Sequence, residues 1–234
     1  MPQLALAIET SSQGGSLAVV EHQTPIFTLA LGKTQRTAAA LGPALEKTLD
    51  WLRSRNEQPD IVGVSGGPGS FTGLRIAVSC AKTLAYALEV PLVAVDSLAA
   101  IGMTTQFDLQ QSHSASDDSI QPSELWIGLN AYRGQVFGGR YQFTEPAAAI
   151  SDVYFANAWQ HLIADPAEDP IPVVGDAKVF AGHESRLVPR LSVDAVGVGL
   201  LALRLAAIGK TTDPMQLVPR YLRPSAAEEK AASS

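Results

Sequence analysis

The chain has 234 residues, of which 46% are hydrophobic and 17% are charged, with a formal net charge of −6. This composition supplies enough apolar surface for a packed core and excludes a chain that is disordered by composition. The length allows one domain or two small ones. The excess of acidic residues is unfavourable for a protein that holds nucleic-acid phosphates by itself.

Composition also bears on location. No stretch approaches the roughly 20 apolar residues that cross a bilayer, and the first residues carry no basic segment typical of a signal peptide. The lone cysteine, Cys80, has no partner for an internal disulfide and suits a reducing compartment. We therefore expect a cytoplasmic protein that makes no membrane contact.

The first hundred residues alternate strand and helix patterns. Polar residues and glycines at 10–15 form a hairpin turn between the first two predicted strands. Gly42-Pro43 would break or kink a helix that began at Thr37. In chain order the sequence predicts strands at 4–8, 17–20 and 26–31, a helix with Leu41, Leu45, Leu49 and Leu52 on one face, a strand at 61–64, a helix at 74–88, a strand at 91–95 and a short helix capped by Ser97.

The second half repeats the opening pattern after a polar segment. Predicted strands at 125–130 and 135–143 flank a turn with Gly134, which indicates a weak internal duplication. A strand at 172–174 and an apolar helix at 194–208 follow. The expected organisation is α/β, with mixed sheets and packed helices in a first subdomain at 1–105, a linker at 106–123, a second, reduced subdomain at 124–225 and a frayed tail at 226–234.

The segment Ser65-Gly66-Gly67-Pro68-Gly69-Ser70-Phe71-Thr72-Gly73-Leu74-Arg75 joins a predicted strand to a helix. Glycine-rich loops before a helix bind phosphate through backbone N–H groups. This one lacks the Gly-Lys pair of a Walker A loop, and Lys82 lies more than two turns into the helix. The alternative is a tight turn whose glycines serve positive φ and close packing, which is the commoner role.

Other candidate residues are weaker. Thr10, Ser11 and Ser12 could contact phosphate, although a polar hairpin turn is usually only a turn. Glu9 is a single carboxylate at the end of the first strand, and Cys80 lies among apolar neighbours, where a small buried residue is expected. The four histidines lack metal-ligand spacing; they are His22, His113, His161 and His183.

The helix after the glycine loop is rich in small residues, among them Gly73, Ala77, Cys80, Ala81 and Ala85. Small residues on two faces allow close approach from both sides. One face can take the sheet, and the second is then free for a partner. Burial of both faces in the protein's own core is an equally weighted alternative.

These residues resemble the TsaB (YeaZ) family, a catalytically silent part of the bacterial machinery that makes threonylcarbamoyladenosine in tRNA. The resemblance spans nearly the whole chain. It is carried by Gly67-Pro68-Gly69-Ser70-Phe71-Thr72-Gly73-Leu74-Arg75, by Glu9-Thr10-Ser11, by Asn130-Ala131-Tyr132-Arg133-Gly134-Gln135-Val136 and by Tyr221-Leu222-Arg223. The family more often has Asp at the position of Glu9, and an acid at that of Asn130. The resemblance implies two actin-like, ribonuclease H-like subdomains.

The same fold houses TsaD, the catalytic relative, which holds its metal with a His-x-x-x-His motif after the fifth strand. Aligned there, the histidines fall on Ser97 and Ile101, and Ile101 has no donor atom. The resemblance therefore implies a non-catalytic partner of TsaD, with TsaE joining the pair, and tRNA bound only through the complex. No catalytic residue, metal or cofactor is expected, and Thr10, Ser11, Ser12 and Gly69 remain weak nucleotide candidates.

In the family, two helices meet the equivalent pair of TsaD, and the same face can pair with itself in a homodimer. The implied interface comprises Leu41, Leu45, Gly73, Leu74, Ala77, Val78, Ala81 and Lys82. Two rival functions stay open on the residues alone. One is an actin-like small-molecule kinase that binds ATP through Glu9, Thr10 and the glycine loop, and the other is a glycoprotease-type metallopeptidase, for which no ligand set is visible.

Overall fold

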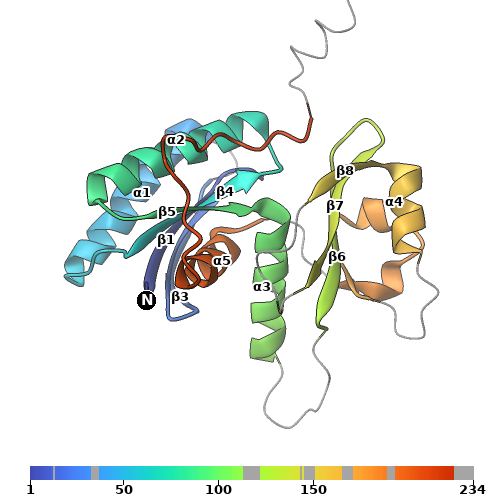
Figure 1. The fold of residues 1–234 in the computed structure, drawn as a ribbon, viewed down its shortest axis with the longest axis horizontal. Coiled ribbons are helices and arrows are strands. Elements are labelled where there is room, and N and C mark those ends of the chain that lie inside the picture. The colour runs from blue at the N-terminus through green and yellow to red at the C-terminus, as the bar shows by residue number, and fades with distance from the viewer. Residues whose placement is uncertain are drawn as a thin grey trace, which may run out of the picture.

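A computed structural model describes residues 1–12, 14–32, 37–112, 122–142, 144, 151–164, 171–188 and 193–223. It shows two lobes, each built on a five-stranded sheet (Figure 1). The first sheet has the order β3-β2-β1-β4-β5, in which β1, β2 and β3 are antiparallel and β4 and β5 run parallel to β1. Its strands are β1 (Leu4–Glu9), β2 (Ser16–Glu21), β3 (Thr24–Ala30), β4 (Ile61–Gly67) and β5 (Leu92–Asp96).

The alternation of large and small residues in β1 assigns the two faces of the first sheet. Successive side chains of a strand point to opposite faces. Leu4, Leu6 and Ile8 pack in the core beneath α1 (Thr37–Ser54) and α2 (Phe71–Leu88). Ala5 and Ala7 pack in the other core, beneath α5 (Ala195–Ala207). Figure 1 shows α1 and α2 on one side of this sheet and α5 on the other.

Close approach of α5 to the sheet explains why that face carries small residues. A Cβ on Gly199 would lie 2.6 Å from a Val20 methyl carbon, and one on Gly63 would lie 2.9 Å from the Ala202 Cβ. Asp194 caps the helix by accepting a hydrogen bond from the Gly197 N–H at 2.9 Å. No helix of the described residues is long and apolar enough to cross a membrane.

The second lobe repeats the sheet topology of the first with fewer helical residues. Its order β8-β7-β6-β9-β10 has the same strand directions as β3-β2-β1-β4-β5. This confirms the predicted duplication and the two-subdomain, actin-like class with a reduced second half. The elements are β6 (Glu124–Asn130), β7 (Gln135–Gln142), β8 (Asp152–Phe155), α4 (Ala156–Ile163), β9 (Val173–Gly175) and β10 (Leu187–Val188), with 3₁₀ turns η1 (Ala177–Phe180) and η2 (Glu184–Arg186).

Two of the predicted boundaries are wrong. The helix α3 (Ser97–Ser112) is long rather than short and continues into the predicted 106–123 linker. Its buried residues lie before residue 106 and pack against α5 and against strands of the second lobe. Residues 113–121 and the predicted tail lie outside the described residues. The apolar helix α5 belongs to the first lobe and not to the 124–225 subdomain, since it packs on β1, β2 and β4.

Helix α1 begins at Thr37 and contains Pro43, so the predicted break at Gly42-Pro43 does not occur. Pro43 stands early in the helix, where its missing N–H costs one hydrogen bond to the preceding turn. Pro43 is exposed, whereas Leu41, Ala44 and Leu52 are buried. Burial of this apolar face against the sheet offsets that cost.

The predicted partner stripe on α2 faces the protein's own sheet. Ala77 and Ala81 have no exposed surface and belong to the core cluster shared with β1 and β4. The predicted interface is therefore wrong for the members that are buried in the chain itself, since a buried side chain cannot touch a partner. They are Leu41, Gly73, Leu74, Ala77, Val78 and Ala81.

The position of Ala81 leads to a test of this packing. We expect Ala81→Arg to unfold the chain or lower its unfolding free energy by several kcal/mol, because it buries an unpaired charge. The matched variant Ser79→Arg, on the exposed face of the same helix, should stay folded. Circular dichroism melting curves measure both, and equal melting temperatures for the two variants would contradict the assignment of faces.

Candidate functional site

Ligands of open α/β folds bind at the carboxyl ends of the parallel strands. In this chain the β1–β2 turn, the β4–α2 loop and the β5–α3 junction meet at that edge of the first sheet. The structure places four groups of residues at this edge: Glu9, the Thr10-Ser11-Ser12 turn, the loop with Gly69, and the start of α3. The last of these contains Ser97 and Ile101, which the resemblance aligns with histidines of TsaD.

The glycine loop is filled by the chain's own first hairpin. The Ser70 N–H donates to the Ser11 carbonyl at 2.8 Å, and the Thr10 hydroxyl donates to the Gly73 carbonyl at 2.7 Å. A Cβ on Gly69 would lie 2.5 Å from the Ser11 Cβ, and one on Gly73 would collide with the Thr10 carbonyl. These glycines therefore allow close packing of two backbone segments, which is the second of the two roles considered from the sequence. Protein atoms fill the space that a bound phosphate would need at these points.

The Glu9 carboxylate occupies the donors of the first turn. It accepts hydrogen bonds from the Ser11 N–H and, at 2.5 Å, from the Ser11 hydroxyl. It also accepts from the Ser12 N–H at 3.2 Å and from the Ser12 hydroxyl at 2.8 Å. The residue is fully buried, and this burial raises the pKa of its carboxyl while the hydrogen bonds from Ser11 and Ser12 oppose the shift. The N–H and hydroxyl donors of Ser11 and Ser12 are thus already bound to Glu9.

Ser97 and Ile101, the positions that the resemblance aligns with histidines of TsaD, lie in the interior. The Ser97 hydroxyl is 2.6 Å from the Ser65 hydroxyl, which in turn lies 3.3 Å from that of Ser11, and all three residues are buried. Ile101 is packed in the apolar core. A hydroxyl that is already hydrogen-bonded and a hydrocarbon do not form a divalent metal site. Among the described residues, no cluster of His, Cys, Asp and Glu has metal-binding geometry.

Asp96 collects donors from four segments at the junction of the two lobes. Its Oδ1 accepts from the N–H groups of Leu98 at 2.9 Å and Ala99 at 3.0 Å, and from the Tyr141 hydroxyl at 2.8 Å. Its Oδ2 accepts from the Ser151 hydroxyl at 2.5 Å and pairs with the Arg220 guanidinium at 2.9 Å. Burial raises the pKa of Tyr141 well above its usual range, and the nearby negative charge of Asp96 adds to this shift. The β5–α3 junction, β7, the start of β8 and the C-terminal residues are therefore joined at one carboxylate.

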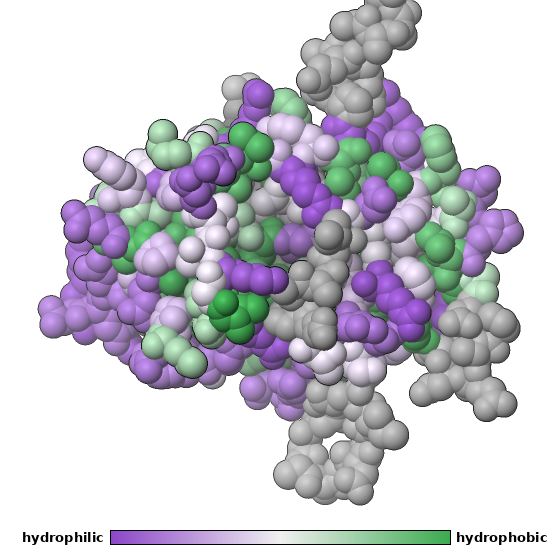
Figure 2. All heavy atoms as spheres, viewed as in Figure 1, coloured by the Kyte–Doolittle hydropathy of each residue, from purple (hydrophilic) through white to green (hydrophobic). Residues whose placement is uncertain are grey.

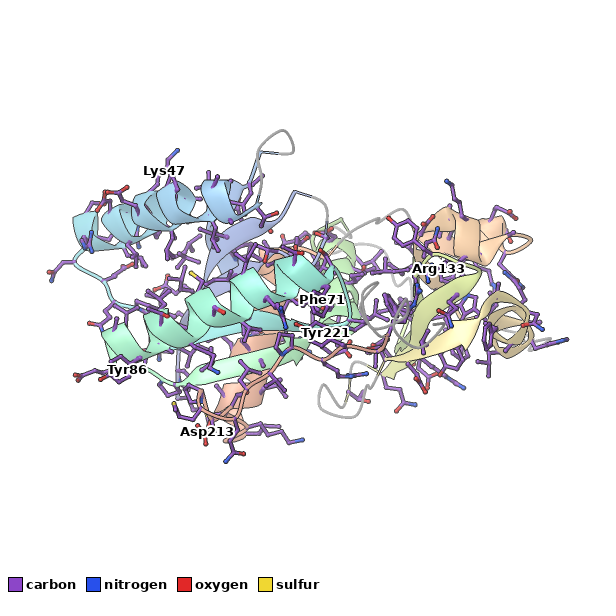
Figure 3. All side chains as sticks on the ribbon, turned by 90° about the horizontal axis from the view of Figure 1, so that it is seen from above. Lys47, Phe71, Tyr86, Arg133, Asp213 and Tyr221 are labelled. Atoms are coloured by element: carbon purple, nitrogen blue, oxygen red, sulfur yellow. The ribbon has the colours of Figure 1, made fainter. Side chains whose placement is uncertain are left out.

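Residues 211–223 run along β5 and α2 after leaving α5. The Lys82 ammonium donates to the Leu217 carbonyl at 3.0 Å, so this member of the predicted interface is committed to its own chain. The Arg220 N–H donates to the Gly66 carbonyl at 2.8 Å. Near the start of α2 the Tyr221 ring stacks on Phe71, with 4.4 Å between ring centroids. Figure 3 shows these two aromatic residues together at one end of the helix.

The remaining sequence candidates carry no reactive arrangement. Cys80 is half-buried and burial raises its pKa, which disfavours the reactive thiolate. His22 and His161 are exposed, and His113 lies outside the described residues. Sequence reasoning missed the roles of Asp96 and Arg220. The only sequence indication was the Tyr221-Leu222-Arg223 match, which adjoins Arg220 and gives no partner for either charge.

The Asp96–Arg220 pair gives a measurable stability effect. We expect Arg220→Met to lower the unfolding free energy by about 1–3 kcal/mol, because it removes a charged donor from a largely buried carboxylate. Arg53→Met breaks an ion pair with Asp50 in which both side chains are mostly exposed, and should change stability by less than about 0.5 kcal/mol. Urea unfolding compares the variants, and equal losses would contradict the joining role of Asp96.

Glu9 gives a pH-dependent effect. Because its folded pKa is raised, the folded state holds the proton more tightly than the unfolded state. Wild-type stability should therefore fall as pH rises above about 4.5 and through the raised pKa. Glu9→Gln cannot titrate, so its unfolding free energy minus that of the wild type should increase with pH in urea titrations between about pH 4 and pH 7.

Glu57→Gln is the control for this titration. Arg55 lowers the pKa of Glu57, so the stability from that group is lost as pH falls. The difference between Glu57→Gln and the wild type should consequently not increase with pH. A flat difference for Glu9→Gln would show that the Glu9 pKa is not raised in the folded state.

The family model of TsaD, tRNA N6-adenosine threonylcarbamoyltransferase, matches residues 34–165. Two structures from Pseudomonas aeruginosa share the fold. One, described as an uncharacterized protein with similarity to peptidase YEAZ, has a TM-score of 0.73 at 22% identity, and the other, described as YeaZ, has a TM-score of 0.69 at 23% identity. Each alignment covers 94% of this chain and all of the other.

Sequence relatives extend the match over the full length. The tRNA threonylcarbamoyladenosine biosynthesis protein TsaB of Bacillus subtilis is 30% identical, and the alignment covers 96% of each chain. The Escherichia coli protein of the same name is 26% identical over 60% of this chain and 55% of its own length. With a relative at this identity over nearly the whole length, and the TsaD family model over more than half of it, the chain belongs to the TsaB family.

Proposed function

We propose that the chain is a non-catalytic partner subunit of a complex with TsaD and TsaE that forms threonylcarbamoyladenosine next to the anticodon of tRNAs reading codons that begin with A. The names of the Bacillus subtilis and Escherichia coli relatives place those proteins in threonylcarbamoyladenosine biosynthesis. In the complex, TsaD supplies the catalytic site and this chain supplies a binding surface.

The observation that carries the non-catalytic role is the filled edge of the first sheet. Ser97 and Ile101 stand inside the core at the positions of the relative's metal-binding histidines. Gly69 and Gly73 are covered by the backbone of the first turn. Among the described residues, this edge offers no metal ligand set, and the N–H groups of Ser11, Ser12, Ser70 and Gly73 are already hydrogen-bonded within the chain, which disfavours a metallopeptidase or kinase site there.

For the partner surface we propose the outer side of α1 and α2 in place of the buried stripe. Small residues are also exposed on that outer side, and half-buried apolar residues lie beside them. Small side chains allow a partner helix to approach closely, and the apolar ones give it contact area. The exposed small residues are Ala38, Ala39, Gly42, Thr72, Ser79, Thr83 and Ala87, and the half-buried apolar ones are Leu45, Leu49, Ile76 and Cys80.

Reconstitution tests both parts of the proposal. The isolated chain should neither hydrolyse peptides nor modify tRNA, and adding it to TsaD, TsaE, ATP and threonylcarbamoyl-adenylate should switch modification on. Ser79→Arg should remain folded and weaken the complex at least about tenfold, because it buries an unpaired charge in the interface. Size-exclusion chromatography and tRNA modification assays give the two readouts.

Ser123→Arg, which adds the same charge at an exposed position of the second lobe, is the matched control and should behave as wild type. Equal tRNA modification by TsaD and TsaE without this chain would refute the partner role. Normal binding by Ser79→Arg would refute the outer side of α1 and α2 as the interface. The same face can pair with itself, and a homodimer lost in the same variant would identify that mode.

A further inference from the structure

Residues 211–223, the latch, leave α5 and cross the first lobe without forming a helix or strand. Figure 1 shows the latch, in red, running from the end of α5 to α2. Its first attachment is to β5, the edge strand of the first sheet. The Thr212 N–H donates to the Leu92 carbonyl at 2.7 Å, and the Thr212 hydroxyl accepts from the Ala94 N–H at 2.9 Å. Thr212 thus pairs with the outer side of β5.

The last residues of the latch are fastened at the boundary between the lobes. The Arg220 guanidinium pairs with Asp96 of the first lobe at 2.9 Å and donates to the Ser151 carbonyl beside β8 of the second. Three residues further on, Arg223 donates to the Ala131 carbonyl in the β6–β7 turn. The latch therefore bonds to both lobes, and its far end lies well away from the β5 attachment.

Little apolar surface of the latch is buried between these attachments. Leu217 packs half-buried against the core of the first lobe, and the Tyr221 ring stacks on Phe71. Met215 and Val218, in contrast, are 87% and 73% exposed. Figure 2, in the same view as Figure 1, shows hydrophilic and hydrophobic residues mixed over the first lobe rather than one broad apolar surface. Polar contacts at separate points therefore supply most of the hold on the latch.

These contacts are too weak to hold the latch one by one. The net contribution of one hydrogen bond is smaller than the entropy cost of ordering a few residues. The residues between Thr212 and Arg220 consequently stay ordered only while both ends are attached. Segments with few apolar contacts open as local units while the rest of a protein stays folded.

The latch also bears on how the second lobe is oriented. Helix α3 packs against β6, β7 and β9 of that lobe. Apolar contact of this kind is non-directional and tolerates small rotations, whereas hydrogen bonds weaken when their angle changes. The bonds that Arg220 and Arg223 make to the second lobe therefore constrain its orientation in a way that packing on α3 does not.

We propose that the latch opens and closes as one unit while both lobes stay folded, and that the closed latch fixes the orientation of the second lobe. Opening frees the outer side of β5 and the Phe71 ring, and it leaves the second lobe held chiefly by its packing on α3. The closed latch makes α2 and the second lobe one rigid body. This device belongs to the free chain and does not depend on the partner role.

Native-state hydrogen exchange of the full chain, followed by NMR, tests the single unit. The N–H groups of Thr212, Ala94 and Arg220 should share one protection factor, smaller than that of amides in the middle of α5. Arg220→Met keeps the backbone and should speed exchange of the Thr212 and Ala94 N–H groups at least about tenfold. Thr212→Val should speed exchange of the Arg220 N–H by a similar factor, because coupling between two sites is reciprocal.

Arg53→Met on α1 and Thr83→Val on α2 are the matched controls, because both side chains are exposed and lie outside the latch contacts. They should leave those exchange rates unchanged, and circular dichroism checks that every variant is folded. Thr212→Val decides the matter by itself where Arg220→Met does not fold. The single unit would be overturned by wild-type N–H groups that exchange as slowly as those of α5, or by variants that affect only the end they alter.

The orientation of the second lobe is measured with spin labels on Lys47→Cys in α1 and Ser123→Cys in the second lobe, in a Cys80→Ala chain. Both labelled positions are exposed, and Figure 3 shows Lys47 on the outside of α1. The distribution of distances between the labels should be broader with Arg220→Met than without it. Equal distributions would overturn the role of the latch in fixing the lobe. Neither measurement uses TsaD, so failure of either leaves the partner role standing, and failed reconstitution leaves the latch unaffected.

Discussion

The Asp96 carboxylate joins four chain segments at the boundary between the lobes, beside the helix α3 that packs against both of them. The first lobe supplies the carboxylate at the end of β5, the second supplies Tyr141 and Ser151, and Arg220 arrives from 124 residues further along the chain. Each donor would otherwise be left unpaired in a poorly solvated space, which is costly. This network therefore fixes how the lobes meet and holds the C-terminal residues against α2. The position of Tyr221 on Phe71 and of Arg223 at the β6–β7 turn depends on it.

At the carboxyl edge of the first sheet, the chain's own backbone occupies the place where this topology can bind a phosphate. The glycines after β4 expose backbone as a phosphate loop would, but here the backbone they admit is that of Thr10 and Ser11. Glu9 then takes the donors of the first turn. A site closed by internal hydrogen bonds is rigid and satisfied. This edge therefore stabilises the shape of the first lobe. Contacts with other molecules are then left to the outer surfaces.

The two lobes have the same sheet topology but cover their sheets with different side chains. In the first lobe, long helices cover both faces, and small residues on the α5 side let that helix lie close to the strands. In the second lobe, Trp159 of the short α4 fills the space above Gly128 and Gly138. A buried Trp side chain removes on the order of 200 Å² from water, and the two glycines leave the room for its ring. The reduced lobe thus keeps its core with fewer helical residues and presents its β6–β7 turn to solvent.

Local pattern by itself determined the strands of the first sheet, its hairpin, the duplication and the apolar helix α5. The reason is that alternation along β1 and helical spacing along α5 are properties of neighbouring residues. The motif after β4 identified the family for the same reason. Which face of α2 is buried could not be deduced, since small residues occur on both sides of the helix and only packing of Ala77 and Ala81 on the sheet selects one. The contacts of Asp96 with Arg220, of Arg75 with Tyr221 and of Arg223 with Ala131 were likewise decided only by tertiary structure, because their members lie far apart in sequence and meet only after the chain has folded.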